Sequence, residues 1–371
     1  MRAVRTMLGF GVLGAVLSGG CVAQQSHGLM TGMNAVNPLR ASVANQNALI
    51  EQLKAAHVRV VRCGISDDAK GIDFAKRLNA AGIRIELIVT PQFAKDAPSV
   101  PYQPKAFPNM WGGHPLSYAD PELSRTSFQS LLSQLDANRI ELAALELGNE
   151  INWTAFNPEF PLPGKGRIFD YKDLSSDPEA KQVAKGYLQY LRVLAVLKEV
   201  RDRSTVNGRT PILSAGLSDP GPARVVPGGK EDAVTINATI QYLREHGLDK
   251  YVDGYGIHQY PWQTTPQARK TAILNNGLAA CGTGAPGQPK PCWITEWGLD
   301  NASTSCPLND KPRAAIAQET MGTFRDMAKS GRVAATIYFS WNSDPWAKQV
   351  SASSVYRCGA ETETAKIALQ P

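Results

Sequence analysis

The sequence predicts an α/β protein that folds as one (β/α)8 barrel, the TIM-barrel architecture, with long loops after several strands. Three observations lead to this expectation. Eight short runs of β-branched and aliphatic residues recur along the chain, helical patterns separate them, and Pro and Gly are scattered rather than gathered into a linker. Strands that alternate with helices form right-handed βαβ units, and eight repeats favour closure into a barrel, although an open doubly wound sheet has the same pattern.

The expected strands, in chain order, are residues 29–36, 57–65, 83–90, 142–150, 211–216, 252–260, 291–298 and 334–341. Apolar residues at helical spacing predict helices over residues 46–56, 69–81, 128–135, 178–203, 235–246 and 311–329. Four of the connections that follow strands are longer than a minimal barrel needs, namely 91–122, 152–177, 218–232 and 262–290. Loops after barrel strands meet at the face where this fold places its active sites, so these loops are expected to form the walls of a cleft.

The first 23 residues have the pattern of a secretory signal, which leaves residues 24–371 for a single barrel domain. Arg2 and Arg5 precede an apolar stretch that is too short to span a bilayer, and small residues follow it. Cys21 resembles a bacterial lipoprotein attachment site, and cleavage after Ala23 is the alternative. The protein is therefore expected to be exported. It would then be periplasmic, secreted, or anchored to the outer membrane as a lipoprotein.

Export implies an oxidising compartment, in which the five cysteines after Cys21 can form disulfides. Cys63 lies in an apolar run and is expected to be a buried free thiol. The hypothesis for the four late cysteines is a Cys281–Cys292 bond that closes a Gly/Pro-rich loop and a Cys306–Cys358 bond between two late loops.

Composition and motifs exclude several classes of function. The chain has 39 Lys and Arg against 33 Asp and Glu, a net charge of +6, and no basic run interleaved with aromatic residues, so nucleic acid is not expected as a partner. The sequence contains no CxxC, HxH or HExxH pattern, so neither a metal site nor a cofactor is expected. A monomer is the expected state.

Ionisable residues follow three of the predicted strands directly, in the segments 145–150, 256–260 and 293–298. A carboxylate at the carboxyl end of a barrel strand points toward the active-site face. Glu150 and Glu296 end different strands, so they are expected to converge there and to divide the roles of acid and nucleophile. Such pairs hydrolyse glycosidic bonds, with retention when the carboxyl groups are about 5 to 5.5 Å apart. Glu146, four residues before Glu150, is expected to be a buried polar support.

Three strand ends resemble the retaining glycoside hydrolases of clan A: the fourth strand ends in Asn149-Glu150, the sixth in His258-Gln259-Tyr260 and the seventh in Thr295-Glu296-Trp297-Gly298. The resemblance implies that Glu150 is the acid/base and Glu296 the nucleophile. It implies that Asn149 binds the sugar 2-hydroxyl. Because Asn149 and Glu150 are adjacent, both reach the site only if the strand end is irregular.

The resemblance extends to residues that support the two glutamates. Arg62, at the end of the second strand, matches an arginine that supports the nucleophile, and Tyr260 matches a tyrosine that hydrogen-bonds to it. His258 lies two residues before Tyr260, so both side chains are expected on the same side of the strand. Trp341, which ends the eighth strand, is expected to be a stacking platform for the sugar.

Further aromatic residues in the long loops are candidates for outer sugar-binding positions: Trp153, Trp262, Trp111, Trp346, Tyr102, Phe107 and Phe156. One departure from the cellulase-like family five is that no histidine follows the third strand, which ends Val89-Thr90-Pro91-Gln92. The resemblance therefore also leaves room for family thirty-nine or for a less familiar branch of the clan.

The prediction is a retaining β-glycoside hydrolase that acts within an oligosaccharide or polysaccharide and needs no cofactor. Two alternatives share these residues. One is a sugar-binding surface lipoprotein that has lost catalysis, and the other is a transglycosylase with the same site.

Overall fold

The computed structural model describes residues 28–371, except 104, 106, 108–109, 222–224 and 344–349. The predicted leader, with the possible attachment site at Cys21, and Trp346 lie outside the described residues. Among the residues that are described, no helix is long and apolar enough to cross a membrane.

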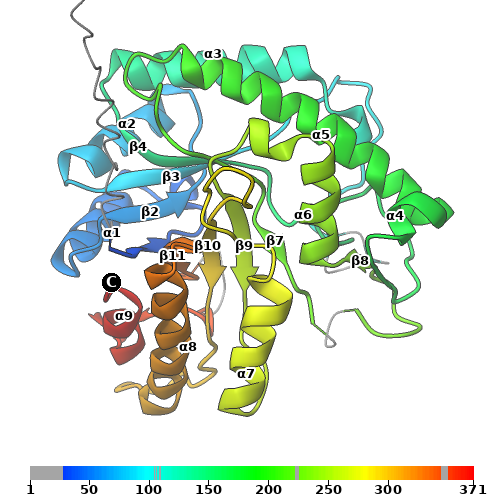
Figure 1. The fold of residues 1–371 in the computed structure, drawn as a ribbon. Coiled ribbons are helices and arrows are strands. Elements are labelled where there is room, and N and C mark those ends of the chain that lie inside the picture. Colours follow the sequence, from blue (N-terminus) through cyan, green and yellow to red (C-terminus); the bar gives the residue numbers. More distant parts are fainter. Residues whose placement is uncertain (1–27, 104, 106, 108–109, 222–224, 344–349) are drawn as a thin grey trace, which may run out of the picture.

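Nine short strands form one parallel sheet that closes into a barrel (Figure 1). The strands are β1 (Met30–Asn34), β2 (Val60–Cys63), β3 (Arg84–Val89), β4 (Leu142–Leu147), β6 (Ile212–Leu213), β7 (Leu217–Ser218), β9 (Tyr255–Gln259), β10 (Cys292–Trp297) and β11 (Val333–Tyr338). Their order is β6-β4-β3-β2-β1-β11-β10-β9-β7.

The closure occurs in the fifth predicted strand, which the structure divides into β6 and β7. β6 pairs with β4 and β7 pairs with β9, so this segment joins both ends of the sheet. Leu213 makes the link by itself, because it pairs with Glu146 on one side and bridges to Gly254 on the other. The predicted (β/α)8 barrel is therefore confirmed, with eight strand segments around it.

Six helices match the predicted ones: α1 (Val43–Ala55), α2 (Ala69–Ala80), α3 (Pro121–Ala137), α5 (Pro178–Asp202), α6 (Ile236–Glu245) and α8 (Lys311–Lys329). The helix α3 begins seven residues earlier than expected because Asp120 caps it, accepting hydrogen bonds from the backbone N–H groups of Glu122 and Leu123, and Pro121 follows at the first helical position. The helices α4 (Asp173–Ser176), α7 (Pro266–Ala272) and α9 (Glu363–Ala368) were not predicted.

Two small additional sheets lie outside the barrel. β5 (Ile168–Phe169) pairs with β8 (Ala233–Val234), and β12 (Tyr356–Arg357) pairs with β13 (Ala360–Glu361). The first pair joins the loop after β4 to the loop after β7, so it connects two of the long insertions on the carboxyl side of the barrel.

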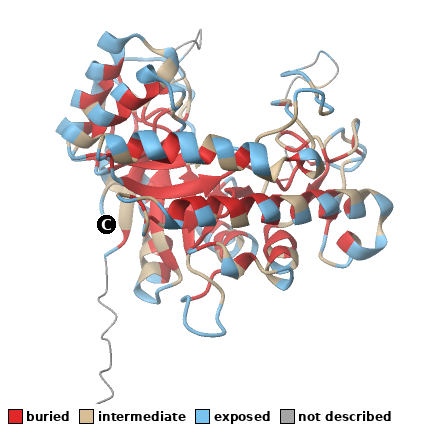
Figure 2. Cartoon of the chain, turned by 90° about the horizontal axis from the view of Figure 1, so that it is seen from above, coloured by how far each residue is buried: buried red, intermediate tan, exposed pale blue. Residues whose placement is uncertain are grey.

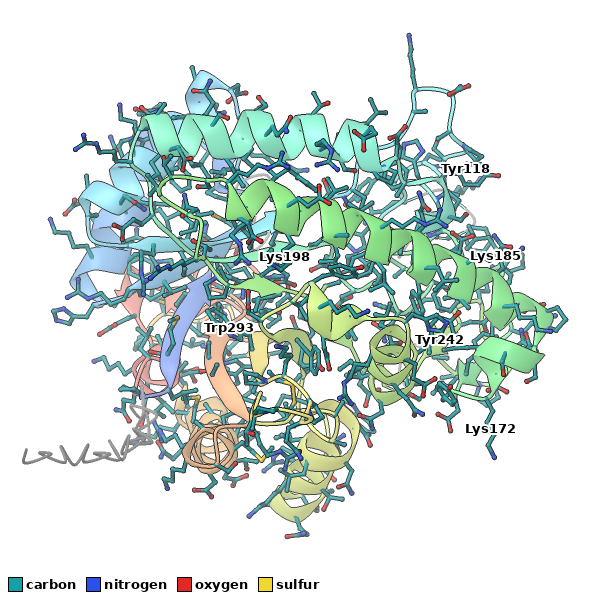
Figure 3. The ribbon with its side chains drawn as sticks, turned by 45° about the horizontal axis from the view of Figure 1, so that its top comes forward. Tyr118, Lys172, Lys185, Lys198, Tyr242 and Trp293 are labelled. Atoms are coloured by element: carbon teal, nitrogen blue, oxygen red, sulfur yellow. A yellow bond between two sulfur atoms is a disulfide. The ribbon has the colours of Figure 1, made fainter. Side chains whose placement is uncertain are left out.

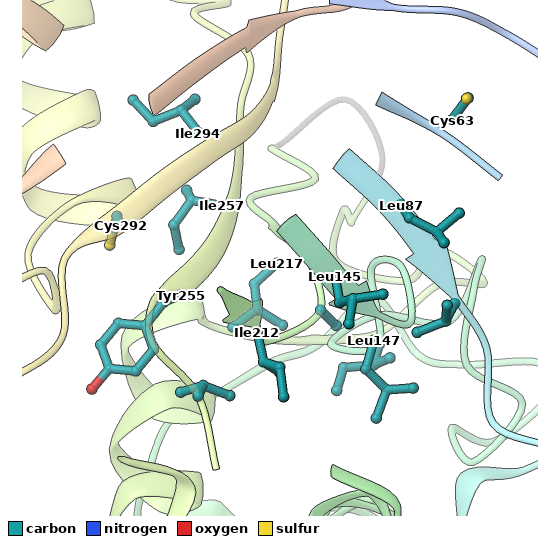
Figure 4. Packing of buried hydrophobic residues seen from close by; sticks show 14 of the residues in the cluster. Cys63, Leu87, Leu145, Leu147, Ile212, Leu217, Tyr255, Ile257, Cys292 and Ile294 are labelled. Atoms are coloured by element: carbon teal, nitrogen blue, oxygen red, sulfur yellow. The ribbon is translucent and has the colours of Figure 1, made fainter. Parts of the chain in front are cut away.

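Burial follows the alternation of side chains along the strands. Most residues of the sheet are buried, whereas the helices carry buried residues on one side and exposed residues on the other (Figure 2). Leu145 and Leu147 on β4 belong to the large apolar cluster between strands and helices (Figure 4), so the residue between them, Glu146, faces the barrel interior. Exposed lysines such as Lys172 and Lys185 lie at the periphery (Figure 3).

The barrel interior has an apolar floor below a layer of charged residues. Ala144, Leu213, Trp293 and Ala335 pack together as a separate buried cluster, each from a different barrel strand. Glu146 lies two residues after Ala144, hence one layer closer to the carboxyl ends of the strands. Apolar side chains therefore lie directly below the charged residues of the barrel interior.

The disulfide hypothesis is confirmed: Cys281 is bonded to Cys292, and Cys306 to Cys358. Cys63 is the free cysteine of the described residues and is buried, as expected. Burial raises the pKa of the Cys63 thiol to about 12, which keeps it protonated and unreactive.

Candidate active site

The predicted polar site residues meet at the carboxyl ends of four strands. Arg62 comes from β2, His258 from β9 and Glu296 from β10, while Glu150 follows β4. Glu150, Glu296, His258 and Arg62 are all buried, with at most 9% of any residue's surface exposed. The site is therefore a largely desolvated group of charges that must compensate one another.

Glu296 has two donors, one for each carboxylate oxygen. Arg62 Nη1 donates to Oε1 at 2.5 Å, and the Tyr260 hydroxyl donates to Oε2. Burial, together with the charges of Glu296 and Glu150, raises the pKa of Tyr260 well above its ordinary value, so the phenol keeps the proton that it donates. A guanidinium and a phenol therefore both direct their hydrogens at the carboxylate oxygens of Glu296, an arrangement suited to negative charge at this position.

Arg62 is itself fixed by a second glutamate in the barrel interior. Its Nε and Nη2 atoms donate to the two oxygens of Glu146 at 2.9 and 3.1 Å. The remaining N–H groups donate to Asn34 Oδ1 and Asn149 Oδ1, both at 3.0 Å. Burial disfavours the charge on Arg62, but Glu146 and Glu296 outweigh it and raise the pKa further above its ordinary value.

The two interior glutamates hold different protonation states. Burial opposes ionisation of Glu146, but Arg62 outweighs it and lowers the pKa of Glu146 to about 2. Burial and the neighbouring charge of Glu146 raise the pKa of Glu86 well above its ordinary value, although its Oε1 is 3.5 Å from Arg62 Nε. Glu146 is thus ionised and Glu86 protonated. Glu146 is the buried polar support that the sequence predicted.

An irregular backbone after β4 lets both Asn149 and Glu150 reach the site. Gly148 has φ of 84° and Glu150 has φ of 46°, so the chain leaves the extended conformation at both positions. The backbone N–H of Glu150 donates to Gly216 O at 2.8 Å, which holds the irregular end against the fifth barrel segment. The expected irregularity is therefore present. In a regular strand the adjacent side chains of Asn149 and Glu150 would point in opposite directions.

Glu150 is held by His258 and Trp153. His258 Nδ1 is 2.7 Å from Oε1, and Trp153 Nε1 donates to Oε2 at 2.8 Å. His258 Nε2 is 3.3 Å from Arg62 Nη2, and an arginine can only donate. This contact assigns the proton of neutral His258 to Nδ1, so that His258 donates to a Glu150 carboxylate.

The protonation of His258 depends on the two glutamates beside it. Burial disfavours the cation on His258, but Glu296 and Glu150 outweigh it and raise the pKa of His258 above its ordinary value. His258 therefore gains a second proton more readily than free imidazole does. Because Nδ1 already donates to Glu150, this proton belongs to Nε2, the ring nitrogen next to Arg62.

Among the described residues, Glu150, His258 and Glu296 are the one group of three whose atoms could ligate a metal, since one atom from each lies within 4.8 Å of the others. Their closest contacts are with each other and with the donors of Arg62 and Tyr260. A guanidinium already compensates Glu296, so the chemistry of this donor set favours proton transfer over binding of a cation.

The predicted aromatic residues have different surroundings. Trp153 is buried and donates to Glu150, whereas Trp262 is 52% exposed and packs its indole over Gly221. Trp341 is fully buried; its Nε1 donates to Gln52 Oε1 at 3.2 Å and its ring stacks on Tyr356.

The expectation of a stacking platform does not fit Trp341, because a fully buried ring has no face to offer a sugar. The physical reason is that β11 ends at Tyr338, so Trp341 lies in the turn that follows the strand. Phe339, directly after β11, is half-buried and packs edge-on against Tyr260 with ring centroids 6.4 Å apart. It is the aromatic residue of this turn that borders the site.

Asn34, Glu86 and Phe339 are site residues that the sequence analysis did not single out. Asn34 and Glu86 had a usable signal: each is a polar residue inside a predicted barrel strand, as Glu146 is. Phe339 had none, because its neighbour Trp341 is equally aromatic and lies in the same predicted strand.

Comparison with solved structures gives similar folds at low sequence identity. A fungal β-1,4-galactanase superposes with a TM-score of 0.53 at 13% identity, covering 92% of this chain and 94% of that one. A family 5 xyloglucanase from Paenibacillus pabuli gives 0.50 at 14% identity, with 93% and 99% covered. A β-glucosidase from Thermotoga maritima gives 0.50 at 12% identity, with 92% and 96% covered. No family model and no curated protein matches the sequence.

Proposed function

We propose that this protein is a glycoside hydrolase that cleaves β-glycosidic bonds with retention of configuration. The observation that carries the proposal is the pair Glu150 and Glu296, whose nearest carboxylate oxygens lie within 4.8 Å. This spacing fits the roughly 5 to 5.5 Å of retaining enzymes and leaves no room for the water that inversion needs at about 6.5 to 9.5 Å. The three similar folds, which carry the names of a galactanase, a xyloglucanase and a glucosidase, support the same class.

In the first step, a carboxylate oxygen of Glu296 attacks the anomeric carbon. The bond from that carbon to the glycosidic oxygen breaks, and Glu150 in its protonated form gives its proton to the departing oxygen and becomes a carboxylate. Arg62 and Tyr260 keep Glu296 ionised before the attack, and their hydrogen bonds weaken as its charge is lost to the new ester bond.

In the second step, Glu150 acts as the base. It takes a proton from a water molecule, whose oxygen attacks the anomeric carbon from the side that the leaving group vacated. The bond to Glu296 breaks, and the sugar leaves with the configuration that it had in the substrate. The alternation of Glu150 between acid and base is supported by its contact with His258, which holds a proton next to it in both steps.

The proposal includes an internal site of attack on an oligosaccharide or polysaccharide. The long segments after β3, β4 and β9 support it, because they lie on the side of the barrel where the carboxyl ends of the strands meet. Export through the predicted leader, with or without a lipid at Cys21, is also part of the proposal and agrees with the two disulfides.

The test is a screen of aryl β-glycosides and of plant and bacterial polysaccharides, with the products identified by chromatography. We expect hydrolysis by the wild type and none by Glu150→Gln or Glu296→Gln on unactivated polysaccharide. Glu141→Gln is the matched control, since Glu141 is exposed at the opposite end of the strand that leads to Glu150. NMR of the first product should show the β anomer. Binding without turnover by the wild type would contradict the proposal, and an initial α anomer would contradict retention.

A further inference from the structure

A row of four aromatic side chains extends outward from Glu150. Trp153 donates to Glu150 Oε2, and its ring centroid is 5.7 Å from that of Phe156. Phe156 stacks on Trp111 with centroids 5.6 Å apart and planes 14° apart. Trp111 and Tyr102 meet at a steep angle, with ring centroids 5.5 Å apart and planes 64° apart. The row thus links the candidate acid to two residues of the segment after β3.

Exposure increases along this aromatic row. Trp153 is only 6% exposed and Phe156 is half-buried, but Trp111 is 51% exposed and Tyr102 is 58% exposed. Single exposed aromatic residues are common on protein surfaces. Here two of them are adjacent and continue a buried row that begins at a catalytic group, so the outer part of the row is placed to meet a ligand that reaches the site.

The backbone holds Trp111 in place. Val100 and Gly113 exchange two hydrogen bonds of 2.8 Å, and the N–H of Trp111 donates to Ala155 O at 2.8 Å. At Gly112, with φ of 74°, an added Cβ would lie 2.6 Å from Val100 O, so only glycine permits this close approach. The segment after β3 is therefore fastened to the loop after β4.

Phe156 covers one face of the Trp111 ring. The exposed half of Trp111 therefore lies on the parts of the ring that Phe156 does not cover. A flat apolar surface that is already fixed binds a partner without a large loss of side-chain entropy. The C–H faces of sugar rings pack on such surfaces, in the way that other apolar groups pack on the faces of aromatic rings.

The direction of the row decides which part of a glycan it would meet. Glu150 protonates the oxygen of the leaving group, so the leaving sugar lies beside Glu150, whereas the sugar that is attacked lies beside Glu296. Trp153 contacts Glu150, and Glu296 is held by Arg62 and Tyr260 from the β2 and β9 strands.

We propose that Trp111 and Tyr102 form a binding subsite for sugar units on the leaving-group side of the cleaved bond. This inference rests on the proposed function and deepens it, because such a subsite acts only on substrates in which the leaving group is itself a saccharide. It gives the segment after β3 a role in choosing oligosaccharides and polysaccharides over simple glycosides.

The experiment compares two substrates of the wild type and of Trp111→Ala: a saccharide cleaved in the screen, and an aryl glycoside of the same sugar, whose small leaving group does not reach Trp111. We expect kcat/KM to fall about tenfold or more on the saccharide, the effect of losing about 1.4 kcal/mol of binding, and to stay within about twofold on the aryl glycoside. Trp111→Phe, which keeps a flat ring, should recover most of the loss.

Tyr102→Ala tests the same subsite with a side chain that is too exposed to be needed for folding. Tyr118→Ala is the matched control, since Tyr118 is 52% exposed in the same insertion but outside the row (Figure 3). A second readout is the transfer of the sugar from the enzyme to an added saccharide acceptor, which occupies the leaving-group side. Its product should decrease relative to hydrolysis in Trp111→Ala.

The outcomes separate the two proposals. An active wild type with equal losses on both substrates, or with no loss in Trp111→Ala and Tyr102→Ala, would overturn the subsite and leave the proposed function standing. A wild type that cleaves no glycoside would overturn the proposed function and the subsite together.

Discussion

Replacing Glu146 with glutamine removes the charge that holds Arg62 inside the barrel. Glu146 accepts two hydrogen bonds from Arg62, and neither residue has more than 2% of its side-chain surface exposed. Glutamine has the same size but no charge, and one of its two terminal atoms donates instead of accepting. In Glu146→Gln, the buried guanidinium of Arg62 therefore loses one neighbouring negative charge. One of its N–H groups then faces the amide nitrogen of the glutamine, which is also a donor.

The expected cost follows from the pKa of Glu146. It is about 2 in the folded protein and 4.5 ordinarily, and a depressed pKa means that ionisation stabilises the folded state. The difference corresponds to about 3 kcal/mol of unfolding free energy. This contribution is complete at pH values above 4.5 and is lost as the pH falls toward 2. Breaking a buried ion pair costs about 3 to 5 kcal/mol in other proteins, which agrees.

The assay is urea unfolding of the wild type and of Glu146→Gln at pH 7, 5, 4 and 3. The variant should be less stable by about 3 kcal/mol at pH 7 and by less than half of that at pH 3. Glu86→Gln is the matched control in the same layer: Glu86 is protonated, so glutamine should change stability by less than about 1 kcal/mol. Equal stability of Glu146→Gln and wild type at pH 7, or a larger loss in Glu86→Gln, would refute the assignment of the two protonation states.

Three further predictions concern other parts of the molecule. Tyr260→Phe should lower kcat about 10- to 100-fold with little change in thermal stability, because it removes one hydrogen bond to the Glu296 carboxylate; an unchanged kcat would contradict that contact. Because the pKa of His258 is raised, the pH profile of kcat/KM should contain a step above the ordinary pKa of histidine, where His258 loses its second proton, and this step should be absent in His258→Asn. Identical profiles of the wild type and the variant would contradict this role of His258. Replacing both cysteines of the Cys281–Cys292 disulfide by serine should lower the free energy of unfolding by about 3 kcal/mol, and doing the same for Cys306–Cys358 should lower it by about 4 kcal/mol, because that bond closes a longer loop. Urea unfolding measures both losses, and unchanged unfolding midpoints would contradict them.

The barrel could be predicted from the sequence because its strands are buried on both sides and are therefore short and apolar. The ends of the elements were less accessible. The start of α3 depends on a cap at Asp120. The fifth predicted strand is divided into β6 and β7 by residues 214–216, where its pairing changes from β4 to β9. Neither feature changes the apolar periodicity on which the prediction was based.

The polar centre of the site could be predicted because each of its residues ends a strand, and strand ends meet at one face in a barrel. Its detail depends on the turn geometry. Phe339 and Trp341 are both aromatic and two residues apart, and only the end of β11 at Tyr338 places one beside Tyr260 and buries the other. The partner of Trp153 was equally hidden, since its hydrogen bond to Glu150 arises from the irregular backbone after β4.

Chemical rescue by azide tests the central claim, the division of roles between Glu150 and Glu296, most directly. The substrate is a β-glycoside of the sugar found in the screen, with dinitrophenolate as a leaving group that needs no acid. Glu150→Ala should still form the sugar ester on Glu296, so that added azide accelerates turnover and yields the β-glycosyl azide. Glu296→Ala lacks the nucleophile, and azide in its place should yield the α-glycosyl azide. The opposite assignment of products, or no rescue of either variant, would contradict the roles of both glutamates.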